Sequence, residues 1–302
     1  MERRLVMESP LKAIGFTQVN EKEMMEDILE ELLSNPTKQE AIQLSAKQIL
    51  AEYMKEIAEN TYVMARVCVN KSSKEPKIQV FSCDAYVEAN TALDVEDVEV
   101  EGFDDGDGGD QSYYVVCEER ETAMQIVFWL QNVVEYLEAR KKNLTCSQVN
   151  IVGIASEGTI VLPIEKDEEE EQIEKEEREK LRLILQQMKN GDEEAKEMLE
   201  KEEKELDDQL KERLREEDFL SVMSGYFIPE TIDEATYAVL GEILEIKERI
   251  NNQTDEKMYI FSLDVNDLNL EVVISQRELI GMPSVGMRFM GTCWIQGKVI
   301  MS

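Results

Sequence analysis

The chain has 302 residues, of which 66 are Asp or Glu and 33 are Lys or Arg, so its formal net charge at pH 7 is −33. A surface this acidic repels phosphate backbones over roughly 8–10 Å, and nucleic-acid binding normally requires basic side chains that neutralise phosphates. We therefore expect no direct contact with nucleic acid or with anionic membrane lipid. Hydrophobic residues make up 42% of the chain, which is enough to bury a globular core.

Histidine is absent from the sequence. Its absence excludes Ser-His-Asp and Cys-His activation of a nucleophile and every metal site built on histidine. The cysteines are Cys68, Cys83, Cys117, Cys146 and Cys293. None belongs to a C-x-x-C pair, so neither a zinc knuckle nor a redox motif is predicted. We expect buried, reduced thiols and no cofactor.

Reduced cysteines are typical of the cytoplasm. No stretch approaches the roughly 18 consecutive apolar residues of a membrane span, and the N-terminus lacks the apolar region of a signal peptide. The sequence therefore predicts a cytoplasmic protein that does not contact a membrane.

The first part of the chain mixes helical and strand patterns. Asn20 and Glu23 have the spacing of a capping box, which predicts a helix over 21–34. A second helix of about 20 residues is expected after Pro36, because Ile42, Ile49, Tyr53 and Ile57 recur at helical spacing. Alternating apolar residues then predict three strands, at 62–69, 76–87 and 112–117.

Two further elements complete this part. An apolar helix is predicted over 121–143, and a hairpin over 149–164 with its turn at Glu157 and Gly158. Residues 1–165 are thus expected to form an α+β domain.

Residues 166–218 are expected to form a charged helical connector. The segment 165–218 contains 24 acidic and 12 basic residues, with thin apolar stripes on either side of Asn190-Gly191, a typical helix stop. Helices docked on one face are favoured, with a dimerisation seam or a loosely ordered arm as alternatives. Leu206, Leu210 and Leu214 form the second stripe and are candidate partner-binding residues.

Residues 219–302 are expected to form a small antiparallel β-sheet or barrel, OB-like or SH3-like. The final strand reads "VGMRFMGTCWIQGKVI", from Val285 to Ile300. No helix follows its glycines, so a phosphate-binding loop is not predicted. Phe289, Gly291, Cys293, Ile295, Gly297 and Val299 should share one face, with glycine marking a bend or a close approach. Arg288 and Trp294 are candidate partner-binding residues on this strand.

Several stretches together resemble the bacterial family called domain of unknown function 3881. They include "LKAIGF" near the start, "NGDEEA" and "EDFLSVMSGYF" in the middle, and "RELIGMPSVGMRFMGTCWIQG" at the end. The resemblance implies a shared fold and a cytosolic setting in bacteria, and it supplies no catalytic or binding residues. It also suggests Met7 rather than Met1 as the first residue.

The loop "DDGDGGD" is the strongest metal candidate in the sequence. Asp104, Asp105, Asp107 and Asp110 offer clustered carboxylates on a Gly-rich loop, which Ca²⁺ favours, but their spacing does not match an EF-hand. A solvated loop between two strands is the favoured interpretation, with a weak metal site as the alternative.

No catalytic constellation emerges, so the sequence favours a non-enzymatic, acidic cytosolic protein that binds a protein partner or itself as a homo-oligomer. One alternative is an acidic mimic of nucleic acid that occupies a basic protein. The other is a divalent-metal-dependent enzyme that uses carboxylates. We rank them in that order.

Overall fold

The structure is a computed structural model of the chain and describes residues 10–17, 21–71, 77–103, 112–164, 168–189, 192–231 and 235–302. Strands account for 53% of the chain and helices for 25%, so the expected α+β class is confirmed. The start of the chain, with Met1 and Met7, and Asn20 lie outside the described residues.

The first half contains one 3₁₀ helix, two α-helices and eight strands among its described residues. These are η1 (Pro10–Ile14), α1 (Glu21–Ser34), β1 (Lys38–Gln43), β2 (Gln48–Ala58), β3 (Thr61–Asn70), β4 (Lys77–Val87), β5 (Ala92–Phe103), β6 (Ser112–Glu119), β7 (Gln125–Leu130), α2 (Val133–Lys141) and β8 (Cys146–Val161). The second half begins with helices and ends with strands. These are α3 (Glu168–Lys189), α4 (Glu193–Glu216), α5 (Phe219–Val222), β9 (Tyr226–Thr231), β10 (Thr236–Ile250), β11 (Lys257–Val265), β12 (Leu268–Ser275), η2 (Gln276–Glu278), β13 (Leu279–Ile280) and β14 (Arg288–Met301).

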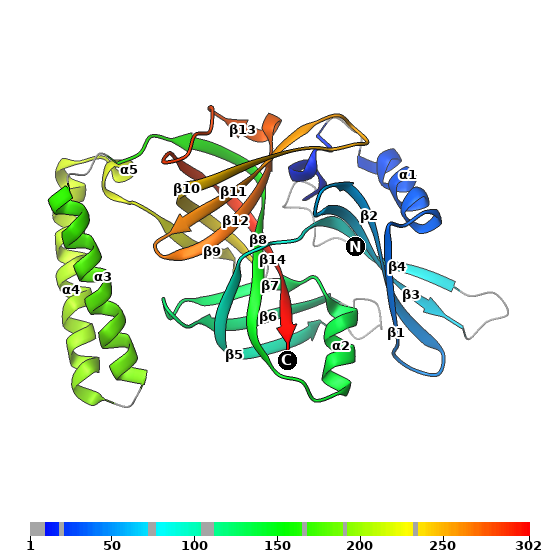
Figure 1. Cartoon of the computed structure of the whole chain (residues 1–302), viewed down its shortest axis with the longest axis horizontal. Coiled ribbons are helices and arrows are strands. Elements are labelled where there is room, and N and C mark those ends of the chain that lie inside the picture. The colour runs from blue at the N-terminus through cyan, green and yellow to red at the C-terminus, as the bar shows by residue number, and fades with distance from the viewer. Residues whose placement is uncertain are drawn as a thin grey trace.

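Two long strands, β8 and β14, form an antiparallel ribbon through the middle of the molecule (Figure 1). Their register runs from the pair Arg288–Val161 at one end to the pair Met301–Cys146 at the other. Because β8 precedes the helices α3 and α4 and β14 ends the chain, this ribbon joins segments far apart in the sequence.

The ribbon is shared by two closed rings of strands. In the first, which we call the β10–β12 ring, β14 pairs with β10, β10 with β11, β11 with β12, and β12 with β8 in parallel. In the second, the β5–β7 ring, β14 pairs with β7, β7 with β6, β6 with β5, and β5 with β8. The rings follow one another along the ribbon, because β14 changes its outer partner from β10 at 288–294 to β7 at 296–297.

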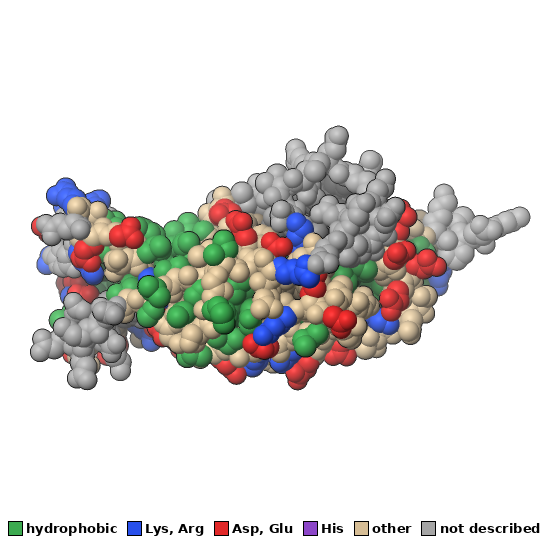
Figure 2. All heavy atoms as spheres, turned by 90° about the horizontal axis from the view of Figure 1, so that it is seen from above, with side chains coloured by type: hydrophobic (Ala, Val, Ile, Leu, Met, Phe, Trp, Pro, Cys, Tyr) green, Lys and Arg blue, Asp and Glu red, His purple; other side chains and the backbone are tan. Residues whose placement is uncertain are grey.

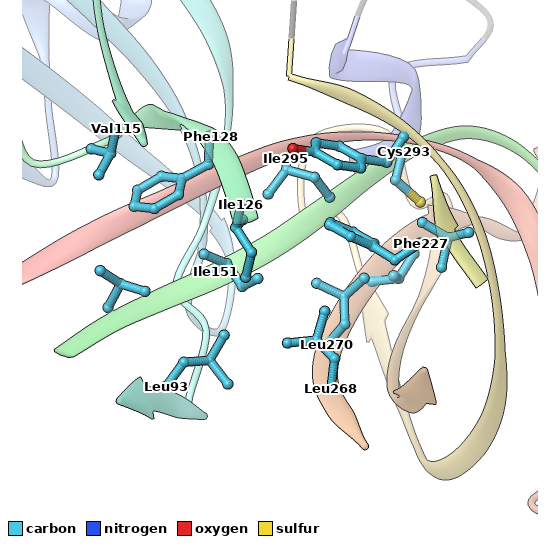
Figure 3. Close-up of a cluster of buried hydrophobic side chains, with 14 of the residues drawn as sticks. Leu93, Val115, Ile126, Phe128, Ile151, Phe227, Leu268, Leu270, Cys293 and Ile295 are labelled. Carbon is cyan, nitrogen blue, oxygen red and sulfur yellow. The ribbon is translucent and has the colours of Figure 1, made fainter. Parts of the chain in front are cut away.

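One hydrophobic cluster fills both rings. Figure 3 shows the labelled side chains in two groups, with Ile295 between them. On β14, Phe289, Cys293, Ile295 and Val299 belong to this cluster, which confirms the face predicted for the final strand.

Bulky rings fill the interior at the points where the ribbon has glycine. Gly158 and Gly291 face each other in the register, and the ring of Phe289 lies over both. A Cβ at position 158 would lie 2.3 Å from Phe289 Cε2, and one at position 291 would lie 2.6 Å from the Glu157 carbonyl oxygen. Glycine here therefore allows the close approach of another backbone and a large side chain, as the sequence predicts for Gly291 but not for Gly158.

A second, four-stranded sheet has the order β1-β2-β3-β4 and lies beside the ribbon. A second hydrophobic cluster joins this sheet, η1 and α1 to the outer face of the ribbon. From the ribbon it contains Val152, Ile154 and Trp294. The ribbon is thus covered on both faces.

The second predicted helix is wrong, because β1 and β2 form an antiparallel hairpin there. The residues chosen for the helical stripe include Ile42 and Ile57, and both are buried in the strands instead. Lys, Glu, Ala and Met in this segment favour a helix locally, but pairing of β2 with both β1 and β3 overrides that preference.

Two other predicted elements are also wrong. The apolar helix over 121–143 is strand β7 followed by the short helix α2, and the hairpin over 149–164 is the single strand β8. Gly158, which was read as a turn residue, is instead the site covered by Phe289. Strand β5 was not predicted, because its many acidic residues hide the alternation that places Leu93 and Val95 in the core.

The predicted connector does form two helices, α3 and α4, with Asn190 and Gly191 outside the described residues. None of the helices in the described part of the chain is long and apolar enough to cross a lipid bilayer. The division into 1–165, 166–218 and 219–302, and the OB-like or SH3-like class of the last part, remain predictions. The β10–β12 ring also includes β8, which lies before residue 166. This ring therefore contains strands from both the first and the last of the predicted parts.

We expect the substitution Gly291→Ala to lower the free energy of unfolding by about 1–3 kcal/mol, because its Cβ overpacks the ribbon against a backbone oxygen. Urea unfolding monitored by circular dichroism measures this change. The neighbouring Thr292→Ala, which removes a hydroxyl that donates to the exposed Glu230, is the control and should stay within about 0.5 kcal/mol of the unsubstituted chain. Equal stability of Gly291→Ala and the control would contradict the close approach.

Candidate functional site

The four aspartates proposed as metal ligands, Asp104, Asp105, Asp107 and Asp110, lie outside the described residues. Among the residues that the structure describes, no three Asp, Glu or Cys side chains lie close enough together to hold a metal ion. The loop therefore remains a prediction.

The other two candidates on the last strand lie in different surroundings. Arg288 is buried, and its guanidinium donates to the carbonyl oxygens of Leu162 at 2.7 and 2.9 Å, Leu220 at 2.8 Å and Met223 at 2.7 Å. Burial lowers the pKa of Arg288. These bonds tie the end of β8 to the segment that follows α4. Partner binding by Arg288 and Trp294 remains a prediction.

Trp294 lines a cleft between the four-stranded sheet and the middle of the ribbon. One side of the cleft consists of residues from β3 and β4, namely Met64, Arg66, Ser82 and Asp84. The other side consists of residues at the end of β7 and on β14, namely Trp129, Leu130, Gln131, Trp294 and Gln296. The cleft therefore lies where the pairing of β14 changes from β10 to β7.

A buried ion pair holds the two sides of this cleft together. Arg66 lies 2.8 Å from the carboxylate of Glu52, and both side chains are almost completely buried. The same guanidinium donates to the carbonyl oxygens of Leu130 and Gln131, each at 3.2 Å. The second carboxylate oxygen of Glu52 accepts from the amide of Val134 in the first turn of α2. Removal of one partner would leave a buried charge, which typically costs about 3–5 kcal/mol.

Side-chain amides fix the opposite wall. Gln131 donates to the Oε1 atom of Gln296 at 2.9 Å and to the carbonyl oxygen of Val87 at 3.3 Å. Asn132 both donates to and accepts from the backbone of Val299 on β14. These bonds hold the end of β7 and the start of α2 against the ribbon.

Two tryptophans belong to the lining of the cleft. The ring centroids of Trp129 and Trp294 lie 6.3 Å apart, and Tyr114 meets Trp129 edge-on at 6.1 Å. Asp84 is only 8% exposed and belongs to the lining. Burial and then the negative charge of Asp84 raise the pKa of the adjacent Cys83 to about 12. The cleft thus combines two indole rings with a buried carboxylate.

A second candidate surface is the hairpin formed by α3 and α4, which lies beside the two rings (Figure 1). Arg182 connects it to the turns of both rings, at 3.4 Å from Glu121 and 3.6 Å from Asp267. These contacts agree with the favoured prediction of docked helices. The dimerisation seam stays a prediction.

Apolar side chains of this hairpin differ widely in exposure, both near its tip, where Met198 is 46% exposed, and near its base. Ile184 and Ala195 are 3% and 1% exposed. Ile173 and Leu206 lie three helical turns from them on the same faces, yet they are 55% and 39% exposed. Leu214 is 37% exposed and Leu210 is partly buried, so the predicted stripe does lie on one side of α4.

A family model described as "Domain of unknown function, E. rectale Gene description (DUF3881)" matches residues 11–297. The chain belongs to the DUF3881 family. The comparisons with curated proteins and with solved structures gave no match. The range matched by DUF3881 spans the hairpin and both sides of the cleft, and the resemblance drawn from the sequence is confirmed.

Sequence reasoning on this DUF3881 chain missed most of the residues that line the cleft. Arg66 interrupts the apolar strand "YVMARVCV", and Asp84 interrupts "VFSCDAYV". A charged residue in the middle of a strand that is buried on both faces signals a buried polar contact. Trp129 was assigned to a helix, so its pairing with Trp294 was not foreseen.

The buried thiols should be protected from modification in the folded protein. Burial raises the pKa of Cys83 and of Cys117 to about 12, and it raises that of Cys293 further. Because the thiolate is the reactive form, these three should react about 1000-fold or more slowly with a disulfide reagent at pH 8 than free cysteine.

All five thiols should react quickly once the chain is unfolded in guanidinium chloride. Absorbance of the released thiol anion, combined with mass mapping of the modified peptides, identifies which residues react. Fast labelling of Cys83 in the folded protein would contradict its burial beside the cleft.

Proposed function

We propose that this protein is a non-enzymatic, acidic, cytoplasmic protein that binds a partner protein through the open seam of its helical hairpin. The observation that carries the proposal is the exposure of apolar side chains on α3 and α4, where Ile173, Leu206 and Leu214 are 55%, 39% and 37% exposed. Helices bury such stripes against another element, and a seam left open offers room for one more helix.

Charge decides which kind of helix fits. The hairpin segment 165–218 contains twice as many acidic as basic residues, 24 against 12, and the whole chain carries −33. A second copy would bring the same negative charge to the interface, whereas a basic partner would find opposite charge along both rims of the seam. The proposed occupant is therefore a basic amphipathic helix of a different protein.

The N-terminal half of α3 explains why the seam is open. Glu176, Glu177 and Glu179 are exposed there, and Lys180 forms an ion pair with Glu202 across the hairpin. Leu206 stays 39% exposed beside these charged side chains, whereas Ala195 near the tip is 1% exposed. The leucines are then left for a partner to bury.

A fluorescent amphipathic peptide of Leu and Lys should bind the intact protein at tens of micromolar, and a Leu and Glu peptide of equal length should not. The triple substitution Leu206→Ser, Leu210→Ser and Leu214→Ser should weaken binding of the basic peptide at least about 10-fold, equivalent to about 1.4 kcal/mol. Fluorescence anisotropy measures both affinities, and circular dichroism checks that the helices remain.

The matched control removes exposed apolar groups elsewhere. Ile280, Met282 and Val285 are 71%, 85% and 62% exposed, and hydrophobic side chains gather on the face that carries β13 (Figure 2). Their substitution with serine should leave peptide binding unchanged. Loss of binding in this control but not in the leucine variant would contradict the hairpin as the site. Self-association of the unsubstituted chain without peptide binding would contradict a heterologous partner.

A further inference from the structure

Three segments without a charged side chain meet at one end of the ribbon. Residues 158–164, 219–229 and 279–287 contain no Asp, Glu, Lys or Arg, although 33% of the whole chain is charged. The first is the end of β8 with the residues that follow it, the second is α5 with the start of β9, and the third is β13 with the loop before β14. Peptide binding at the hairpin does not use them.

One side chain, Arg288, joins all three segments. It follows Met287 directly, and its guanidinium donates to the carbonyl oxygens of Leu162 in the first segment and of Leu220 and Met223 in the second. Strand β13 also pairs in parallel with the end of β8. Arg288 itself is only 5% exposed, so its charge is held inside the protein while the three segments lie side by side.

Large apolar side chains on these segments are exposed. Leu162, Ile280, Met282 and Val285 are 72%, 71%, 85% and 62% exposed, and Phe219 on α5 is 45% exposed. Figure 2 shows hydrophobic side chains gathered on the face that carries β13. We call these five residues the uncharged patch. Monomeric proteins seldom expose a large contiguous apolar patch unless it binds something.

Charge decides which occupant fits the patch. Like charges that face each other across an interface are strongly unfavourable, so two chains of −33 can pack closely only through segments that lack acidic side chains. A basic partner has no such requirement, because acidic side chains attract it. An anionic membrane is repelled by the net charge of the chain. A surface built from uncharged segments therefore fits a second copy of this chain.

We infer that the uncharged patch is a self-association surface, through which two copies of the chain pack face to face as a twofold-symmetric dimer. Each copy contributes the same patch to such an interface, so no second complementary surface is needed. Burial of the apolar side chains supplies the affinity. The inference does not rest on the function proposed for the hairpin.

Sedimentation velocity of the intact chain from about 1 to 100 μM tests the inference. The unsubstituted chain should form a species of twice the mass of one chain, which is 34.8 kDa, with a dissociation constant below about 10 μM. An increase in sodium chloride from about 50 to 500 mM should strengthen the dimer roughly 3-fold or more, because salt screens the repulsion between two acidic chains. The same increase should weaken the binding of a basic peptide at the hairpin.

Two variants of the patch should dissociate the dimer. The triple substitution Ile280→Ser, Met282→Ser and Val285→Ser removes apolar area and should weaken the dimer at least about 10-fold. The single substitution Met282→Glu adds a like charge at the most exposed of these positions and should weaken it as much, more strongly at low salt than at high salt. Circular dichroism checks that each variant is folded.

As a matched control, serine replaces three exposed apolar residues elsewhere. Ile78 and Val80 on β4 and Ile250 at the end of β10 are 59%, 40% and 61% exposed, and their substitution should leave the dimer unchanged. The leucine variant of the hairpin should also dimerise as the unsubstituted chain does. A failure of this inference is thereby distinguished from a failure of partner binding at the hairpin.

An unsubstituted chain that stays monomeric at about 100 μM at both salt concentrations would overturn the inference, and this result needs no variant. A dimer that weakens with salt, that survives both patch variants, or that the control variant dissociates equally would also overturn it. Flotation of the unsubstituted chain with phosphatidylcholine vesicles, lost in Met282→Glu, would overturn it as well, because the occupant would then be a lipid surface.

Discussion

The pairing of β8 with β14 is the constraint on which the remaining structure depends. The two strands pair with each other along one edge over almost their whole length. The outer edges are then divided among several partners: β5, β12 and β13 along β8, and β10 and β7 along β14. Neither ring closes without this ribbon, since it supplies two strands to each.

The ribbon also explains how a charged helical hairpin can be part of the same chain. β8 ends at Val161 and the chain returns at Phe219, so everything between is an excursion from one end of the ribbon. Arg288, the first residue of β14, bonds to the carbonyl oxygens of Leu162 and Leu220 on either side of this excursion. The α3–α4 hairpin can therefore expose a surface of its own while the two rings beside it remain closed.

Local patterns in the sequence were sufficient for elements whose neighbours lie close in the chain. The helices α1, α3 and α4 were predicted from a capping box and from apolar stripes. The final strand was also predicted, because Phe289 and Cys293 alternate with outward residues.

Elements that depend on distant partners were not predictable from those patterns. β2 has a helix-like composition and becomes a strand because β1 and β3 pair with it. Gly158 resembles a turn residue, and only Phe289, more than a hundred residues later, reveals its role. The cleft needs Arg66, Trp129 and Trp294 from three separate strands, and no spacing within the sequence brings them together.

Hydrogen–deuterium exchange in increasing denaturant tests the shared ribbon most directly. The account predicts that amides of β6 and β7 in one ring, β11 and β12 in the other, and β8 and β14 between them become exchangeable in a single transition with one free energy of opening. Protection that persists in β11 and β12 after it is lost in β6 and β7 would contradict the account, because each ring would then be stable without the other.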